Sequence, residues 1–141
     1  MRKRISVTHV VVANDGESKI EGYVTLALKP ILRDSLPNAK KDNLPRGDYT
    51  VAFIGQIATS QDQQGKGIGT RLLYFALSRA LTLSQYIGIA GVALDVLHDA
   101  GEDPIVFEKR RDFYLNRGFK PLIDDERLFI SMKEIEKMGL L

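Results

Sequence analysis

The sequence Gln64-Gly65-Lys66-Gly67-Ile68-Gly69-Thr70 decides how this 141-residue chain is interpreted. It follows a strand-like run at residues 49–58 and leads into a long amphipathic segment. Glycine at three alternate positions lets the backbone turn tightly with no Cβ in the way. Successive N–H groups and the start of a helix can then point at one anion. The stretch therefore predicts a loop that holds the phosphates of a nucleotide-bearing ligand.

The spacing disfavours two common phosphate-binding loops. A P-loop requires Lys followed by Ser or Thr, whereas Lys66 is followed by Gly67. The dinucleotide fingerprint requires G-x-G-x-x-G, and Gly69 comes one residue too early after Gly65 and Gly67. Neither a kinase-like nucleoside triphosphatase nor Rossmann binding of NAD fits this loop.

Two motifs resemble those of one enzyme superfamily. Gln64, Gly67 and Gly69 form the pattern [QR]-x-x-G-x-[GA] between a strand and a helix, which resembles the acetyl-CoA loop of the GNAT acetyltransferases. Downstream, Arg111-Asp112-Phe113-Tyr114-Leu115-Asn116-Arg117-Gly118-Phe119 resembles their [FY]-Y-x-x-x-G-F signature, in which the tyrosine faces the thioester. Taken singly, the first stretch could be a glycine-rich hairpin, and the second could be an ordinary helix C-cap. Together and in this order, they favour the superfamily.

The composition restricts the class of protein. With 44% hydrophobic residues, we expect residues 1–141 to form a single domain. No apolar run approaches the roughly 20 residues of a membrane span. No apolar run follows the basic residues 2–4, as it would in a signal peptide. We therefore expect a soluble, cytoplasmic protein with no membrane partner. The chain has no cysteine, so acyl transfer should be direct, without a cysteine acyl-enzyme. His9 and His98 lack ligand-spaced partners, and no metal site is expected.

The hydrophobic pattern predicts the order β-β-loop-β-loop-α-β-α-β-β. We expect strands at 5–13, 22–28, 49–59, 91–97, 119–122 and 127–132, helices at about 68–86 and 104–117, and an irregular connection at 29–48. The tail after Lys133 can add a short helix.

This order resembles the GNAT fold from its second strand onward. The resemblance implies an α/β (α+β) acyl-CoA N-acyltransferase fold with a mixed, mostly antiparallel sheet flanked by helices, lacking the usual N-terminal strand and helices. Those helices usually form one wall of the acceptor groove. We therefore expect a homodimer, or a large acceptor that docks on the surface.

Three runs are similar to a narrower group. Residues 53–59, 87–92 and 111–121 are similar to the acetyltransferase toxins of type II toxin–antitoxin modules, which acetylate the amino group of aminoacyl-tRNA. The resemblance implies acetyl-CoA as co-substrate, aminoacyl-tRNA as a candidate acceptor and an antitoxin protein as a candidate partner. The chain departs from these toxins in lacking their additional first helix and in a longer interval between His98 and Tyr114.

Roles for individual residues follow from the chemistry and the resemblance. Transfer requires stabilisation of an oxyanion and protonation of the leaving thiolate. Tyr114 is the candidate acid, since its reference pKa of about 10 lies close to that of a thiol; packing in the core is the alternative. The oxyanion donor should be a backbone N–H of Ile57 or Ala58, with the backbone of Thr59 holding the pantetheine arm. For the pyrophosphate we expect backbone N–H groups of Gln64, Gly65, Lys66, Gly67, Ile68, Gly69 and Thr70, with help from the charges of Lys66 and Arg71.

Other assignments stay open. Asp95, His98 and Glu102 are candidate general bases without a motif, and an amine of low pKa would need none. Basic clusters at residues 2–4, at Lys29, Arg33, Lys40, Lys41 and Arg46, and at 109–111 could line a phosphate track or be solvated, because a net charge of +2 is mild. The acceptor could instead be a small amine or a protein N-terminus, with an acidic pocket from Asp124, Asp125 and Glu126. A non-catalytic acetyl-CoA-binding subunit is the alternative of another class.

Overall fold

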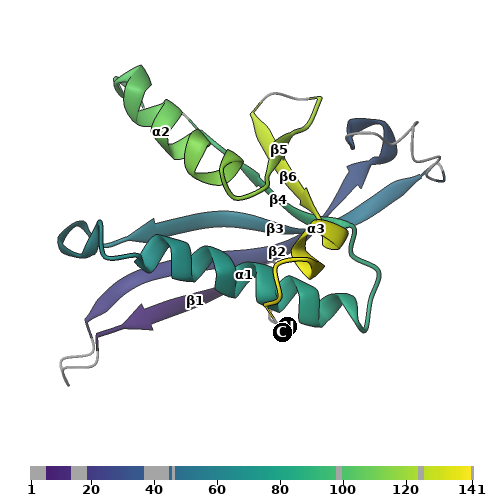
Figure 1. Cartoon of the computed structure of the whole chain (residues 1–141), viewed down its shortest axis with the longest axis horizontal. Coiled ribbons are helices and arrows are strands. Elements are labelled where there is room, and N and C mark those ends of the chain that lie inside the picture. Colours follow the sequence, from purple (N-terminus) through teal and green to yellow (C-terminus); the bar gives the residue numbers. More distant parts are fainter. Residues whose placement is uncertain are drawn as a thin grey trace, which may run out of the picture.

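The order of elements agrees with the order predicted from sequence. The computed structural model describes residues 6–13, 19–36, 45, 47–97, 100–123 and 126–140. Its elements are β1 (Val7–Val12), β2 (Ile20–Leu32), the 3-10 turn η1 (Arg33–Ser35), β3 (Asp48–Thr59), the 3-10 turn η2 (Gln61–Gln63), α1 (Ile68–Ser84), β4 (Gly91–Asp95), α2 (Pro104–Leu115), β5 (Lys120–Pro121), β6 (Arg127–Ser131) and α3 (Met132–Glu136) (Figure 1). The short helix expected after Lys133 begins one residue earlier, at Met132.

The strands form one six-stranded sheet in the order β1-β2-β3-β4-β6-β5. Only β3 and β4 pair in parallel, and the other neighbours are antiparallel. The prediction of a mixed, mostly antiparallel sheet with helices packed on it is confirmed.

The prediction of an irregular connection at residues 29–48 is wrong for the first residues of that range. Strand β2 continues to Leu32 and pairs with the first part of β3, with Pro30 opposite Thr50. Proline normally interrupts a sheet because it lacks the N–H donor. Here the described pairing of β1 with β2 stops at Val7 opposite Leu26, so within the described residues the rest of β2 is an edge strand, where proline is tolerated. Arg46 and residues 37–44 of this connection lie outside the described residues.

A bulge in β3 separates the two central strands. The β2–β3 register shifts so that Gly55 has no partner, and the Gln56 N–H donates to Thr25 Oγ1 at 2.8 Å. A Cβ on Gly55 would lie 2.9 Å from that same hydroxyl oxygen, which is too close. The β3–β4 ladder ends at Ile54 opposite Leu94. From Gly55 onward β3 therefore pairs with β2 alone, and in Figure 1 its end lies beside α1 while β4 leads toward α2.

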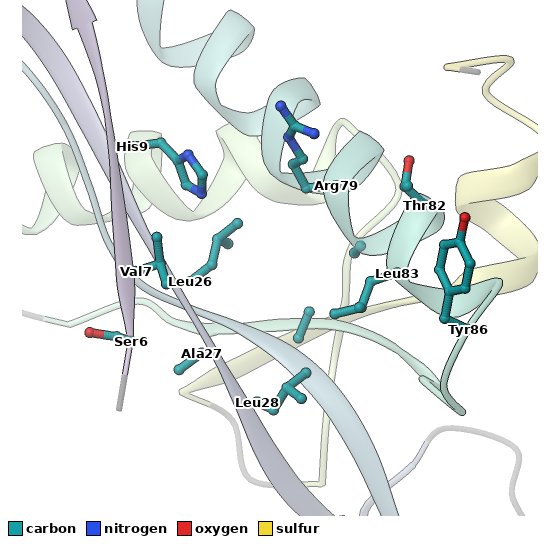
Figure 2. A pocket seen from close by; sticks show the side chains of 12 residues that line it. Ser6, Val7, His9, Leu26, Ala27, Leu28, Arg79, Thr82, Leu83 and Tyr86 are labelled. Carbon is teal, nitrogen blue, oxygen red and sulfur yellow. The ribbon is translucent and has the colours of Figure 1, made fainter. Parts of the chain in front are cut away.

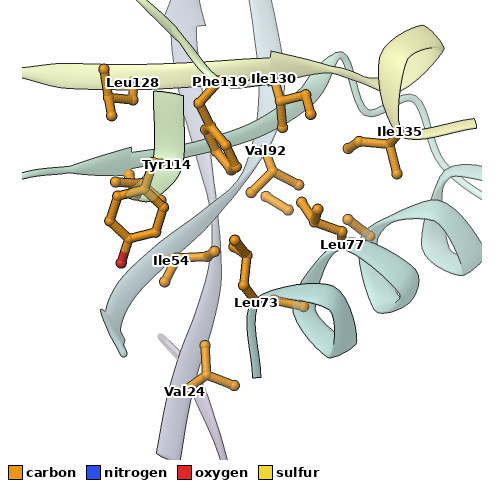
Figure 3. Close-up of a cluster of buried hydrophobic side chains, with 14 of the residues drawn as sticks. Val24, Ile54, Leu73, Leu77, Val92, Tyr114, Phe119, Leu128, Ile130 and Ile135 are labelled. Carbon is orange, nitrogen blue, oxygen red and sulfur yellow. The ribbon is translucent and has the colours of Figure 1, made fainter. Parts of the chain in front are cut away.

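Helix α1 covers one face of the sheet. Its buried side chains recur at helical spacing and pack on the strand residues that face them (Figure 3). They are Ile68, Leu72, Leu73, Ala76, Leu77, Ala80 and Leu81. Alternate strand residues face the opposite side. There a smaller cluster forms from Ile31, Leu36, Val51, Phe53, Ala93, Leu122 and Phe129.

The described residues contain neither a membrane-spanning helix nor a cluster of metal-binding side chains. In the part of the chain that the structure describes, no helix is long and apolar enough to cross a membrane. Nor do three His, Cys, Asp or Glu side chains of those residues gather where they could hold a metal ion.

We predict that Gly91→Ala destabilises the fold strongly. A Cβ at this position would lie 2.1 Å from the carbonyl oxygen of Ile130 and 2.7 Å from the Phe129 ring. Backbone atoms of two paired strands cannot yield as a flexible side chain does, so we expect a loss of at least about 2 kcal/mol. Thermal unfolding followed by circular dichroism measures it. Gly88→Ala is the matched control, because a Cβ there meets no atom within 4 Å, and equal melting temperatures for the two variants would contradict the prediction.

Candidate active site

The glycine-rich loop, the end of β3 and the end of α2 surround one small cavity. Its volume is about 270 Å³. It is lined by Thr59, Gln63, Gln64, Gly65, Gly67, Ile68, Gly69, Thr70 and Phe113. Residues predicted from the glycine spacing thus lie together with two that were not predicted, Gln63 and Phe113. Phe113 precedes Tyr114 in the second motif, which is the signal that could have identified it.

The loop leaves the first N–H groups of α1 without helical partners. Gly65 and Gly67 have φ values of 82° and 81°, which favour glycine. Gly67 is the N-cap and has no side chain to cap the helix, while Ile68 is buried and anchors the first turn. The Arg71 N–H donates to the Gly67 carbonyl at 3.1 Å as the first bond of the helix. The N–H groups of Ile68, Gly69 and Thr70 are therefore available to an anion, at the end where the helix dipole is positive.

The two cationic side chains of the loop region stand outside this cavity. Lys66 and Arg71 are both exposed and neither lines it. The backbone N–H of Lys66 donates to the Gln63 carbonyl at 3.4 Å, so that donor is used within the turn. The part expected of these charges in binding phosphate stays a prediction.

The end of β3 presents backbone donors to the gap beside β4. The N–H groups of Gln56 and Ser60 both donate to β2. Because N–H groups alternate in direction along a strand, that of Ala58 also points to β2. Those of Ile57 and Thr59 point the other way, where the ladder to β4 has already ended at Ile54. The sequence could not choose between Ile57 and Ala58 as the oxyanion donor. The direction of their N–H groups distinguishes them, because only that of Ile57 points toward the gap.

Tyr114 lies where the two strands separate. It is the one buried residue of α2, and its ring makes edge contacts with Phe113 and Phe119 at centroid distances of 5.1 and 5.7 Å. Figure 3 shows the ring beside Ile54, with its hydroxyl pointing away from Phe119 and Ile130. Among the described residues, the Tyr114 hydroxyl has no hydrogen-bond partner. Every fully buried side-chain oxygen of those residues does have a partner, so the Tyr114 hydroxyl must be accessible. It is free to donate to a ligand.

The surroundings of Tyr114 keep its phenol protonated. Burial raises the pKa of Tyr114 from 10.0 to about 12, and the nearby Arg110 guanidinium opposes part of that rise. At neutral pH the group therefore holds its proton and can act as an acid. Core packing and an accessible hydroxyl occur together in this residue, so the two interpretations offered by the sequence do not exclude each other.

Polar contacts at its start hold α2 in place. The Asp103 carboxylate accepts from the Ile105 N–H at 2.9 Å and caps the helix, with Pro104 at its first position. Arg110 forms an ion pair with Glu102 and donates to the Leu97 carbonyl at 2.7 Å. Together with the partly buried Phe107, Phe113 and Leu115, which pack against the core, these bonds position Tyr114.

The candidate general bases are engaged elsewhere or lie outside the described residues. Asp95 accepts two bonds from Arg127, at 2.7 and 3.1 Å, and both of its carboxylate oxygens are engaged in them. Glu102 is occupied by Arg110. His98 is not described.

The basic clusters do not form one described surface. Lys29 stacks on the Phe53 ring at 3.9 Å, and Arg33 pairs with Asp34 at 3.0 Å. Residues 2–4, Lys40, Lys41 and Arg46 lie outside the described residues, as do Asp124 and Asp125 of the alternative acidic pocket.

A larger cavity lies away from Tyr114. It measures about 650 Å³ and lies between β1, β2 and the second half of α1 (Figure 2). Leu26, Leu28 and Leu83 line it, with His9 and Arg79 on one side of the view. The His9 ring packs on Phe75 at 4.9 Å, which gives it a packing role. Neither the glycine-rich loop nor Tyr114 lines this cavity.

Comparison with known proteins identifies the family. The model of the acetyltransferase (GNAT) domain matches residues 6–121, well over half of the chain. A tRNA-acetylating toxin of Mycobacterium tuberculosis is 26% identical over 95% of this chain and 78% of its own length. The probable toxin TacT of Sinorhizobium fredii is 32% identical over 92% of this chain and 71% of its own length.

Solved structures of toxins share the fold. AtaT complexed with acetyl-methionyl-tRNAfMet superposes with a TM-score of 0.82 and 27% identity, covering 96% of this chain and 76% of that one. AtaTR bound with acetyl-CoA has a TM-score of 0.75 and 27% identity, covering 96% and 75%. The family match, the splayed β3 and β4 strands and the accessible Tyr114 agree: the chain belongs to the GNAT acetyltransferase family and is an N-acetyltransferase.

Proposed function

We propose that the chain moves an acetyl group from acetyl-CoA to the α-amino group of an aminoacyl-tRNA and thereby acts as a toxin that blocks translation. The observation that carries the proposal is the similarity, over nearly all of the chain, to a tRNA-acetylating toxin and to AtaT with its acetylated tRNA. The relative bound with acetyl-CoA supports that molecule as the donor.

The cofactor would lie along the loop and the end of β3. In this arrangement the pyrophosphate accepts bonds from N–H groups between Gln64 and Thr70, with Lys66 and Arg71 adding positive potential. The pantetheine arm follows β3 into the gap beside β4 and bonds to the backbone of Thr59. We assign the oxyanion donor to the Ile57 N–H, which points into that gap, in preference to Ala58, whose N–H points to β2.

Transfer would proceed in one ternary complex. The neutral amine attacks the thioester carbon, and the carbonyl oxygen becomes an oxyanion held by the Ile57 N–H. The carbon–sulfur bond then breaks, and Tyr114 donates its proton to the departing sulfur. The amide nitrogen loses its extra proton to water, and the Tyr114 phenolate takes a proton back from water. With a pKa of about 12, Tyr114 is protonated at neutral pH, so its proton is present when the thiolate forms.

The acceptor itself reduces the need for a base. An α-amino group has a reference pKa of about 8, and the adjacent ester of an aminoacyl-tRNA lowers it further. A useful fraction of the amine is therefore neutral at physiological pH. This agrees with the engagement of Asp95 and Glu102 in ion pairs.

Partners follow from the same relatives. We propose an antitoxin protein that neutralises the chain, action in the cytoplasm, where both substrates occur, and a homodimer of chains that each form one domain. The similarity of the chain to two toxins supports a neutralising protein as its partner.

We predict that Tyr114→Phe lowers the rate of acetyl transfer by about a hundredfold or more while CoA binding is unchanged. A general acid typically contributes 10²–10⁴-fold, and the substitution removes only a hydroxyl that bonds to no described residue. Steady-state kinetics with labelled acetyl-CoA and calorimetry with CoA measure the two effects. Tyr86→Phe is the matched control, because Tyr86 is exposed and lies at the larger cavity. Full activity in Tyr114→Phe would remove the tyrosine from the mechanism.

The acceptor is tested by offering labelled acetyl-CoA with bulk aminoacyl-tRNA, and separately with free amines and peptides. We expect label on the tRNA fraction, released as N-acetyl amino acid by mild alkaline hydrolysis. Deacylated tRNA is the control and should stay unlabelled. Label only on small amines or peptides would overturn the toxin proposal. Transfer to none of these acceptors, with CoA binding retained, would favour a non-catalytic subunit.

A further inference from the structure

Arg117, just beyond the end of α2, reaches across to the start of α1. Its Nη1 donates to the Phe113 carbonyl at 2.8 Å, and its Nη2 donates to Thr70 Oγ1 at 3.4 Å. The guanidinium carbon lies 3.9 Å from the centroid of the Phe113 ring. Thr70 and Phe113 both line the 270 Å³ cavity. Arg117 does not itself line the cavity, but its guanidinium contacts two residues that do, one of which ends the glycine-rich stretch.

The charge of Arg117 is not neutralised by the residues around it. Arg110 and Arg127 each pair with a carboxylate, on Glu102 and Asp95. Across the described ranges, Arg117 forms no ion pair, and its two bonds go to a carbonyl and a hydroxyl. A guanidinium has five N–H donors, so donors remain for a further acceptor.

The side chain is also preorganised. Stacking on the Phe113 ring and the bond to the Phe113 carbonyl hold a long, flexible group in one orientation. Much of the entropy that a free arginine would lose on binding is therefore already lost in the folded chain. Lys66 and Arg71, in contrast, are exposed, whereas Arg117 is half-buried.

We propose that Arg117 binds a phosphate group of the CoA nucleotide from its position beside Thr70 and Phe113, at the edge of the cofactor site. The inference rests on the proposed use of acetyl-CoA. A partly buried cation beside open backbone N–H groups suits a ligand with several phosphates, and a guanidinium can bind one of them with two parallel bonds. The cofactor has a pyrophosphate and a 3′-phosphate, and either presents the oxygens that Arg117 would bind.

A purely structural role is the competing explanation, because the bond to the Phe113 carbonyl also closes the end of α2. The two roles predict different responses to a donor without phosphates. If Arg117 only holds α2, and with it Tyr114, its loss should reduce transfer from acetyl-pantetheine as much as from acetyl-CoA. If it binds phosphate, transfer from acetyl-pantetheine should stay unchanged.

The test compares the wild-type chain with Arg117→Gln by calorimetry with CoA and dephospho-CoA, and by kinetics with acetyl-CoA and acetyl-pantetheine. We expect the Kd for CoA to rise about tenfold or more, and kcat/KM to fall only for acetyl-CoA. Equal weakening toward dephospho-CoA would assign the pyrophosphate, and weakening toward CoA alone would assign the 3′-phosphate. Arg79→Gln is the matched control, since Arg79 also stacks on a phenylalanine, at 5.0 Å from Phe75, but at the other cavity.

Three results would overturn the proposal. One is an unchanged Kd for CoA in Arg117→Gln, and another is an equal loss with both acetyl donors. If the wild-type chain itself binds no CoA, the proposed function fails together with the inference. If Arg117→Gln does not fold, Arg117→Lys replaces it, because lysine keeps the charge and loses the paired donors. We then expect a severalfold rise in the Kd for CoA. An unchanged Kd for CoA in this variant would refute the inference.

Discussion

The functional arrangement depends on the one-residue bulge at Gly55. Because this glycine is left unpaired, the parallel ladder between β3 and β4 stops at Ile54, and the rest of β3 pairs with β2 alone. An unbroken ladder would use the backbone donors of Ile57 and Thr59 for a neighbouring strand. The separation leaves those donors open and makes room for Tyr114 between the strands. The Thr25 hydroxyl secures the bulge by accepting from the Gln56 N–H.

Two opposing requirements meet at Tyr114. Its ring must be buried so that the hydroxyl has a fixed position, whereas the hydroxyl must still reach a ligand. Burial also raises the pKa of Tyr114 to about 12. The helix that bears it has no other buried residue and is held by a capping aspartate, by Arg110 with Glu102 at one end and by Arg117 at the other. Electrostatic contacts thus add to the packing of Tyr114 and of the partly buried side chains of α2 in positioning the candidate acid.

The sequence predicted most of the fold and the centre of the site, because both rest on local patterns. Glycine spacing identified the loop, and the second motif identified Tyr114. The continuation of β2 through Pro30 was missed because proline is tolerated only where β1 has ended, which depends on the length of another strand. The choice between Ile57 and Ala58 depends on the register of the bulge. Arg117 was overlooked as a site residue because its contact, Thr70, lies 47 positions away in the chain.

The central claim is that the gap beside β3 holds the thioester against Tyr114. A crystal structure with a non-hydrolysable acetyl-CoA analogue tests it most directly. The account predicts a thioester carbonyl oxygen that accepts from the Ile57 N–H, a sulfur position within about 3.5 Å of Tyr114 Oη, and a pyrophosphate on the loop from Gln64 to Thr70. An acyl group far from Tyr114, or a pantetheine arm seated in the larger cavity beside β1, would contradict it.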